Sequence, residues 1–457
     1  MPPIAETWSR ASKLGFMSSH EFALRSSRVV TPDGERPAVV HVRTGRIVDV
    51  SVEAPPGVLV RDVGDRVILP GVVDAHVHVN EPGRTEWEGF HTATRAAAKG
   101  GITTIVDMPL NSIPVTTSVK ALETKREAAR GRVHVDCAFW GGVVPGNAAD
   151  LTALVEAGAR GAKAFLVPSG IDEFPASDEA TLRTAMHALA ASKAPLLAHA
   201  ELMGACCAMP RVAHDYADYL ASRPRAWEND AIRSLIALCR ETGCRTHIVH
   251  LSSADAIALV AAAQAERLPV SAETCPHYLT FAAESIPARS PAFKCAPPIR
   301  EQENRERLWQ ALGEGVIGMV VSDHSPSPPE MKSPGVGDLM AAWGGISSLQ
   351  FSLSAVWTGA SMRGFGLSHV SRWMSLGPAR LAGLEARKGA IAPGLDADLV
   401  VFNPEASFVV TPDQVLHRHK LTPYLGMTLQ GAVEETYVRG HKVYDRGTFS
   451  GPCGDLL

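Results

Sequence analysis

The sequence lacks the features that would place the protein in a membrane, on nucleic acid or in a disulfide-rich scaffold. No uninterrupted apolar run reaches about 18 residues, the length that a membrane span requires. A net charge of -4 over 457 residues gives no basic footprint for nucleic acid or an acidic membrane surface. The eight cysteines follow no regular spacing, which suits reduced thiols. These absences predict a cytoplasmic protein without nucleic-acid or membrane partners.

The two ends of the chain have a β-rich texture. Residues 1–18 lack the apolar core of a signal peptide, and we expect them to be a flexible leader, with an organellar targeting segment as the alternative. Short apolar runs and tight turns follow from about Phe22 to Asp65, and the same texture returns near the C-terminal end. Residues 19–68 and 387–457 are therefore expected to build one composite β-sandwich.

Residues 69–386 alternate short apolar runs with longer, helix-compatible stretches. The eight strand-like runs are GVVDAHVHV, TTIVDMP, VHVDCAFWG, GAKAFLV, PLLAHAE, THIVHLSS, PVSAETCP and GMVVSDHSP. Eight β-then-α units favour an α/β fold of the (β/α)8 TIM-barrel type over an open doubly wound sheet. No GxGxxG motif follows the first run, which further disfavours a dinucleotide-binding fold.

Potential metal ligands recur toward the same end of these predicted strands. His76 and His78 are spaced i, i+2, so both imidazoles project from one face of the first strand. An isolated pair of this kind is often two ordinary strand histidines. Here the later strands add Lys163, His199, His250 and Asp323. Because the active sites of barrels form at the C-terminal ends of the strands, we expect these six residues to converge on one metal site.

Lys163 lies inside an apolar run, where a charged ammonium is costly and would repel a metal ion. Reaction of its neutral amine with carbon dioxide gives a carbamate, whose two oxygens can bridge two divalent ions. Two such ions carry +4, and the carbamate, Asp323 and a bridging hydroxide reduce this to +1, whereas an unmodified lysine leaves +3. We therefore predict N6-carboxylysine at position 163, with a lysine paired to a carboxylate as the alternative.

Motifs along nearly the whole chain resemble those of the cyclic amidohydrolases of the amidohydrolase superfamily, most closely the allantoinase group. They are DAHVHVNEPGRTEWEGF, DMPLNSIPVTT, GAKAFL, PSGIDEFP, LLAHAE, HLSSA, ETCPHYLTF, KCAPPIR, SDHSPSPPEMK and WGGISSLQ. The resemblance implies that His76, His78 and Asp323 hold one ion, that His199 and His250 hold the other, and that the Lys163 carbamate bridges them. It also implies zinc as the metal and a homotetramer as the assembly.

The expected reaction is hydrolysis of a cyclic amide. Two close metal ions lower the pKa of a bridging water and polarise a carbonyl, and Asp323 then serves as base and acid. The resemblance implies that allantoin is the substrate and allantoate the product. The candidate substrate contacts are Asn80, Asn111, Ser325 and the backbone at Ala296, and the loop PSGIDEFPASDE is a candidate cover for the site.

Three alternatives remain at this point. A dihydropyrimidinase or hydantoinase would use the same ligands, and a dihydroorotase would typically carry an arginine at position 80 to pair with the substrate carboxylate. Asn80 favours an uncharged substrate, although Arg84 lies close by in the sequence. A non-catalytic assembly scaffold would be expected to have lost some of the ligands, and all six are present.

Overall fold

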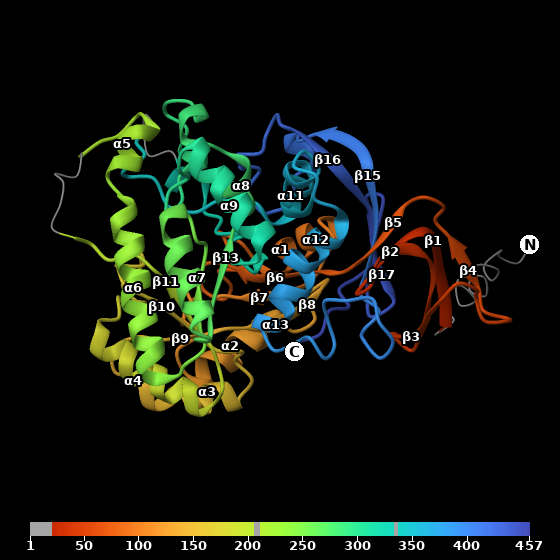
Figure 1. Cartoon of the computed structure of the whole chain (residues 1–457), viewed down its shortest axis with the longest axis horizontal. Coiled ribbons are helices and arrows are strands. Elements are labelled where there is room, and N and C mark those ends of the chain that lie inside the picture. Colours follow the sequence, from red (N-terminus) through yellow and green to blue (C-terminus); the bar gives the residue numbers. More distant parts are fainter. Residues whose placement is uncertain (1–20, 205–210, 333–336) are drawn as a thin grey trace, which may run out of the picture.

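The computed structural model describes residues 21–204, 211–332 and 337–457. The predicted leader, residues 1–18, lies outside this range, as do Cys206 and Cys207. The described chain forms a barrel surrounded by helices, with a β-rich unit on one side of it (Figure 1). The six cysteines in the described part are free thiols. None of the helices described is both long and apolar enough to cross a bilayer.

All eight predicted strands of the barrel are present, and the third predicted run is split into two short strands. The strands are β6 (Val72–Val77), β7 (Ile102–Asp107), β8 (Asp136–Phe139), β9 (Gly141–Gly142), β10 (Ala162–Phe165), β11 (Leu196–His199), β12 (Thr246–Ile248), β13 (Val270–Thr274) and β14 (Met319–Val320). Strand β9 continues β8 after an interruption at Trp140. The two together occupy one strand position, so these nine segments fill the eight strand positions of the barrel. Most residues of these strands are buried, as expected for parallel strands that are covered on both faces.

The strands close into a barrel through two connections between smaller sheets. Strands β6, β7 and β8 form one parallel sheet, and β9 to β14 pair in order in another. The β8–β9 segment belongs to both sheets. On the other side, Val77 pairs in parallel with His324, just after β14. The predicted fold class is therefore confirmed.

Helices follow most of the strands and lie outside the barrel (Figure 1). They are α1 (Phe90–Lys99), α2 (Val119–Ala129), α3 (Leu151–Glu156), α4 (Glu179–Ala191), α5 (Tyr216–Ala221), α6 (Arg225–Thr242), α7 (Ile257–Ala265), α8 (Pro276–Thr280), α9 (Gln302–Glu314), α10 (Pro329–Lys332), α11 (Ser352–Ser361), α12 (Leu367–Ser371) and α13 (Gly377–Leu381). Helix α4 begins where the Asp178 carboxylate accepts a hydrogen bond from Thr181 N, a normal N-cap. Helix α6 ends at Gly243, which adopts a left-handed conformation.

Both chain ends contribute to one nine-stranded mixed sheet. Its strands are β1 (Glu21–Thr31), β2 (Gly34–Arg43), β3 (Arg46–Ser51), β4 (Val60–Asp62), β5 (Val67–Pro70), β15 (Leu399–Val409), β16 (Thr428–Val438), β17 (His441–Asp445) and β18 (Thr448–Phe449). The two ends join where β5 pairs antiparallel with β15. The strands enclose a core of their own, to which Leu24, Val40 and Leu399 belong. The residue limits of this unit remain a prediction.

The last residues described, 453–457, pair with the N-terminal half of the β8 region. Cys137 N donates to Asp455 O at 2.8 Å, and Leu457 N donates to Cys137 O at 2.8 Å. Leu457 also packs against the cluster that fills the barrel interior. This C-terminal tail therefore covers the edge of β8 that β10 leaves open, because β10 pairs with β9 and β11.

Gly454 makes the packing of the C-terminal tail testable. A Cβ added at this position would lie 2.1 Å from Val135 O, a backbone atom that cannot move aside cheaply. We expect Gly454→Ala to lower the free energy of unfolding by about 1–3 kcal/mol, measured by urea denaturation. Gly451→Ala is the matched control, because nothing lies within 4 Å of its added Cβ. Equal stability of the two variants would contradict this account of the tail.

Candidate metal centre

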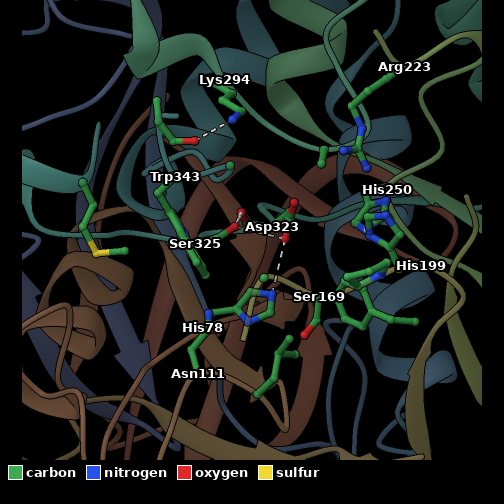
Figure 2. Close-up of a pocket in the computed structure, with 18 of the residues that line it drawn as sticks. His78, Asn111, Ser169, His199, Arg223, His250, Lys294, Asp323, Ser325 and Trp343 are labelled. Carbon is green, nitrogen blue, oxygen red and sulfur yellow. Dashed lines mark hydrogen bonds and ion pairs between the residues drawn. The ribbon is translucent and has the colours of Figure 1, made fainter. Parts of the chain in front are cut away.

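A cavity of about 420 Å³ opens at the C-terminal ends of the barrel strands. All six predicted metal ligands line it, so the structure brings together residues that are up to 247 positions apart in the sequence. The six are His76, His78, Lys163, His199, His250 and Asp323. Figure 2 shows His78, Asp323, His199 and His250 facing the same space. The clustering expected from the barrel rule is thus observed.

The backbone turns sharply where these strands end. His250 and Asp323 have φ angles of 39° and 45°, and Asn80 and Asn111 have φ angles of 38° and 73°. Residues other than glycine seldom adopt this left-handed conformation, and such strain concentrates at functional sites. Four of the residues singled out from the sequence therefore have a strained backbone conformation. This conformation costs local stability and sets the direction of the side chain.

One group of ligands comes from the first and last barrel strands. His76 Nε2 lies 3.1 Å from Asp323 Oδ1, and His78 Nε2 lies 3.6 Å from the same oxygen. The three side chains are buried, and their ligand atoms lie within 4.8 Å of one another. Two imidazoles and a carboxylate at this spacing are a normal donor set for a transition-metal ion.

The second group comes from β11 and from the segment that follows β12. His199 Nδ1 and His250 Nε2 face each other at 3.1 Å. The other nitrogen of His199, Nε2, lies 2.8 Å from Glu201 Oε2. Glu201 accepts a hydrogen bond from that nitrogen, which leaves the lone pair on Nδ1 directed toward His250. A metal ion bound by both rings would occupy the side of the cavity nearer to Arg223, which Figure 2 places above His250.

Glu273 on β13 contacts one residue from each group of ligands, His76 and His250. The sequence did not predict a role for it. Its Oε1 lies 2.5 Å from His76 Nδ1 and accepts a hydrogen bond from His250 N at 3.2 Å. Its Oε2 lies 2.9 Å from His247 Nε2. Glu273 therefore fixes the ring of His76 so that Nε2 faces the cavity. The signal for Glu273 in the sequence was its place at the end of a predicted strand.

Lys163 projects into the cavity from β10 and is fully buried. Within the described residues its Nζ has no hydrogen-bond partner. Burial lowers the pKa of Lys163 to about 8, although Asp323 and Glu273 act in the opposite direction. A substantial fraction of this amine is therefore neutral near pH 8, the form that reacts with carbon dioxide.

The protonation states of the other ligands also suit a metal ion. Burial lowers the pKa of His76 and of His250 well below the ordinary value, and the Lys163 charge acts in the same direction. Burial would raise the pKa of Asp323, but contact with His78 outweighs it, and the pKa of Asp323 is lowered. Neutral imidazoles with free lone pairs and an ionised carboxylate are the forms that bind divalent metals.

The donor set fits metal ions for a further reason. Buried polar atoms are normally hydrogen-bonded, and those left without a partner need an explanation. Among the described residues, two candidate ligand atoms of the cavity, His76 Nε2 and Lys163 Nζ, are buried without a hydrogen-bond partner. Unpartnered atoms of this kind in one polar cavity are expected at a site that binds metal ions, when the protein is considered alone.

The predicted substrate contacts divide into two groups. Asn111, Ser325 and Ala296 line the cavity, and the Asn111 Oδ1 atom is buried without a partner in the described part of the chain. Asn80 does not line the cavity. It is buried beside it, and its Nδ2 donates to Pro326 O at 3.3 Å. Direct contact between Asn80 and a substrate stays a prediction, and the location of Asn80 outside the cavity lining does not favour it.

Other cavity residues were not singled out from the sequence as substrate contacts. Arg223, Tyr219, Lys294 and Trp343 line the cavity, and each comes from a loop or short helix outside the strand runs. Pro168, Ser169 and Gly170 of the loop after β10 line it as well. A Cβ added at Gly170 would lie 3.4 Å from the Trp343 ring, so the two segments meet at the edge of the cavity.

The fold and the donor set define a metal-dependent hydrolase site on a barrel. Residues 67–443 match the amidohydrolase family, and the chain belongs to this family. It is 52% identical over 445 residues to the allantoinase of Streptomyces avermitilis, which covers 96% of this chain and 99% of the relative. It is 45% identical to the allantoinase of Arabidopsis thaliana, covering 97% of this chain and 92% of the relative.

The structure resembles solved structures of a hydantoinase and a dihydropyrimidinase. The L-hydantoinase (dihydropyrimidinase) of Arthrobacter aurescens superposes with a TM-score of 0.89 at 32% identity, over 95% of this chain and 99% of that one. The dihydropyrimidinase of Brevibacillus agri superposes with a TM-score of 0.85 at 27% identity. The barrel and the β unit are therefore arranged as in these enzymes.

The role of Glu273 can be tested through metal binding. Glu273→Gln keeps the side-chain volume but weakens the contact with His76, so we expect metal affinity to fall by about 10- to 100-fold. Competition with a fluorescent chelator would measure it. Glu266→Gln is the matched control, because Glu266 is exposed and pairs with Arg240 on the surface. Unchanged affinity in Glu273→Gln would contradict the orienting role.

Proposed function

We propose that the protein opens the hydantoin ring of allantoin to give allantoate. The observation that carries this proposal is the 52% identity to a bacterial allantoinase over nearly the full length of both chains. The cavity supports it, since six candidate ligands converge beside polar groups, Asn111 and Ser325 among them, that suit a hydrogen-bonding ring. The hydantoinase structures at 32% identity or below favour opening of a related ring as the second candidate.

The residues of the cavity can be assigned steps in this hydrolysis. Two divalent ions bound there would polarise the ring carbonyl and lower the pKa of the attacking water. Asp323 accepts a proton from the water as the water oxygen bonds to the carbonyl carbon. The ring C–N bond then breaks, and Asp323 returns the proton to the leaving nitrogen. One water is consumed, and the product carries a new carboxylate and a new N–H group.

The proposal includes carboxylation of Lys163. A buried ammonium beside four histidines would repel metal ions, whereas a carbamate supplies a negative charge and two oxygen donors. The lowered pKa of Lys163, about 8, favours the neutral amine that this modification needs. We take His76, His78 and Asp323 as the ligands of one ion and His199 and His250 as those of the other, with the carbamate between them.

The remaining parts of the proposal rest on the resemblance to relatives and on composition. Zinc is the proposed metal, and imidazole with carboxylate ligands would also accept cobalt, manganese or iron. A cytoplasmic homotetramer is the proposed assembly. Metal analysis of the purified protein and light scattering test these two parts separately from the activity.

Substrate preference is the central test. Allantoin differs from hydantoin by a neutral ureido arm, and a site built to hydrogen-bond a group often rejects analogues that lack it by about 10⁴-fold. We expect kcat/KM for allantoin to exceed by a wide margin the values for hydantoin, dihydrouracil and dihydroorotate on one metal-loaded preparation. If dihydrouracil or dihydroorotate is hydrolysed more efficiently, the substrate assignment is wrong while the metal centre can still be right.

The carbamate makes a separate prediction. Lys163→Ala removes the bridging group, so metal content and turnover should fall together, and native mass spectrometry of the wild type should show the added carbon dioxide. Short carboxylic acids can replace a missing carbamate, so added acetate or propionate should restore part of the activity. A Lys163→Ala protein that keeps two metal ions and normal turnover would refute the bridge.

A further inference from the structure

Arg223 is held rigidly at the wall of the cavity, in the connection between α5 and α6. Its Nε donates to Glu201 Oε1 at 3.1 Å, and its Nη2 donates to Glu201 Oε2. The guanidinium also lies over the Trp227 ring, 6.0 Å from the ring centroid. Glu201 is fully buried and bonds His199 through the same oxygen that Nη2 contacts. The position of Arg223 is therefore tied to that of a metal ligand.

One donor of this guanidinium remains unused. In the described part of the chain, Nη1 of Arg223 has no protein acceptor, whereas Nε and Nη2 are both occupied. The side chain is 21% exposed, and it lines the cavity. Arg223 thus presents a fixed positive charge and free N–H groups to whatever enters. Arginine offers donors and no acceptor, so the group that it binds must be a hydrogen-bond acceptor, such as a carbonyl or carboxylate oxygen.

Three other polar side chains of the cavity are already bonded, whereas the uncharged Trp343 Nε1 is buried without a partner among the described residues. Lys294 Nζ donates to two backbone carbonyls, Met340 O at 2.9 Å and Ala342 O at 2.5 Å. The Tyr219 hydroxyl donates to Cys295 O at 2.6 Å, and the Ser325 hydroxyl donates to Asp323 O at 2.7 Å. Arg223 is therefore the cavity side chain best placed to make a new charged hydrogen bond without breaking an existing one.

Resting on the function proposed above, we propose that Arg223 binds the ureido carbonyl of allantoin and determines the preference for this substrate. Allantoin has two ring carbonyls and one in the ureido arm. The reacting ring carbonyl must lie among the metal ligands, and Asn111 lies on the other side of them from Arg223 (Figure 2). A ring that lies at the ligands with one edge toward Asn111 therefore directs its opposite edge, and the arm, toward Arg223.

The test compares two substitutions that separate recognition from support of the metal centre. Arg223→Lys keeps a positive charge beside Glu201 but removes the planar fork of donors. Glu201→Gln weakens the hold on His199, a positioning role that concerns every substrate equally. Arg225→Lys is the matched control two residues away, because Arg225 pairs with Asp255 and Glu301 and does not line the cavity.

Each variant is assayed for kcat and KM with allantoin, for the competitive inhibition constant of hydantoin and for metal content. In Arg223→Lys we expect kcat/KM for allantoin to fall about 10- to 100-fold, the usual effect of losing a hydrogen bond to a charged group. The inhibition constant of hydantoin, which has the ring without the arm, and the metal content should stay unchanged. In Glu201→Gln, metal content should fall along with activity, and Arg225→Lys should resemble the wild type.

The possible failures can be told apart. If Arg223→Lys weakens hydantoin binding and allantoin turnover by the same factor, or loses metal as Glu201→Gln does, the recognition role is overturned and Arg223 only supports the centre. If Arg223→Lys turns over allantoin at the wild-type rate, the role is overturned as well. A wild-type enzyme that does not open allantoin would instead refute the proposed function, and the inference with it.

Discussion

The candidate centre depends on the contact that closes the barrel. Strand β6 and the segment after β14 are paired through Val77 and His324, and this pairing brings His76 and His78 next to Asp323. Without closure the two histidines and the carboxylate would lie on opposite edges of an open sheet. The remaining ligands need only the regular succession of parallel strands. This pairing of β6 with the segment after β14 therefore places ligand atoms from the first and last strands next to each other in one cavity.

Buried carboxylates behind the histidines complete the electrostatic arrangement. Glu273 contacts His76 and His247, and Glu201 contacts His199 and Arg223. Burial would raise the pKa of Glu201, but the charge of Arg223 and the contact with His199 lower it to about 2. Each carboxylate accepts a hydrogen bond from one ring nitrogen of a candidate ligand, which leaves the other nitrogen free for a metal. The protein thus sets the tautomers of its ligands before any metal binds.

The sequence predicted the eight strands and the six ligand candidates because both follow short-range patterns. A β-branched run indicates a strand, and a polar residue at its end indicates the open face of a barrel. The supporting residues could not be found in this way. Glu273 and Arg223 have their roles through partners that are distant in sequence. The position of Glu273 at the end of a predicted strand is the one local signal for it, and Arg223 has no such signal. Asn80 shows the opposite error of a sequence-based prediction: it lies next to the ligands in the sequence, but its side chain does not line the cavity.

The shared β sheet has a consequence for how the chain folds as it is synthesised. Strands β1 to β5 are made first, yet β5 pairs with β15, more than 300 residues later. Until that segment is made, one edge of the N-terminal strands has no partner, and exposed strand edges promote aggregation. Closure over so long a separation is also slow. The N-terminal strands are thus expected to be prone to aggregation until residues 399–409 have been made.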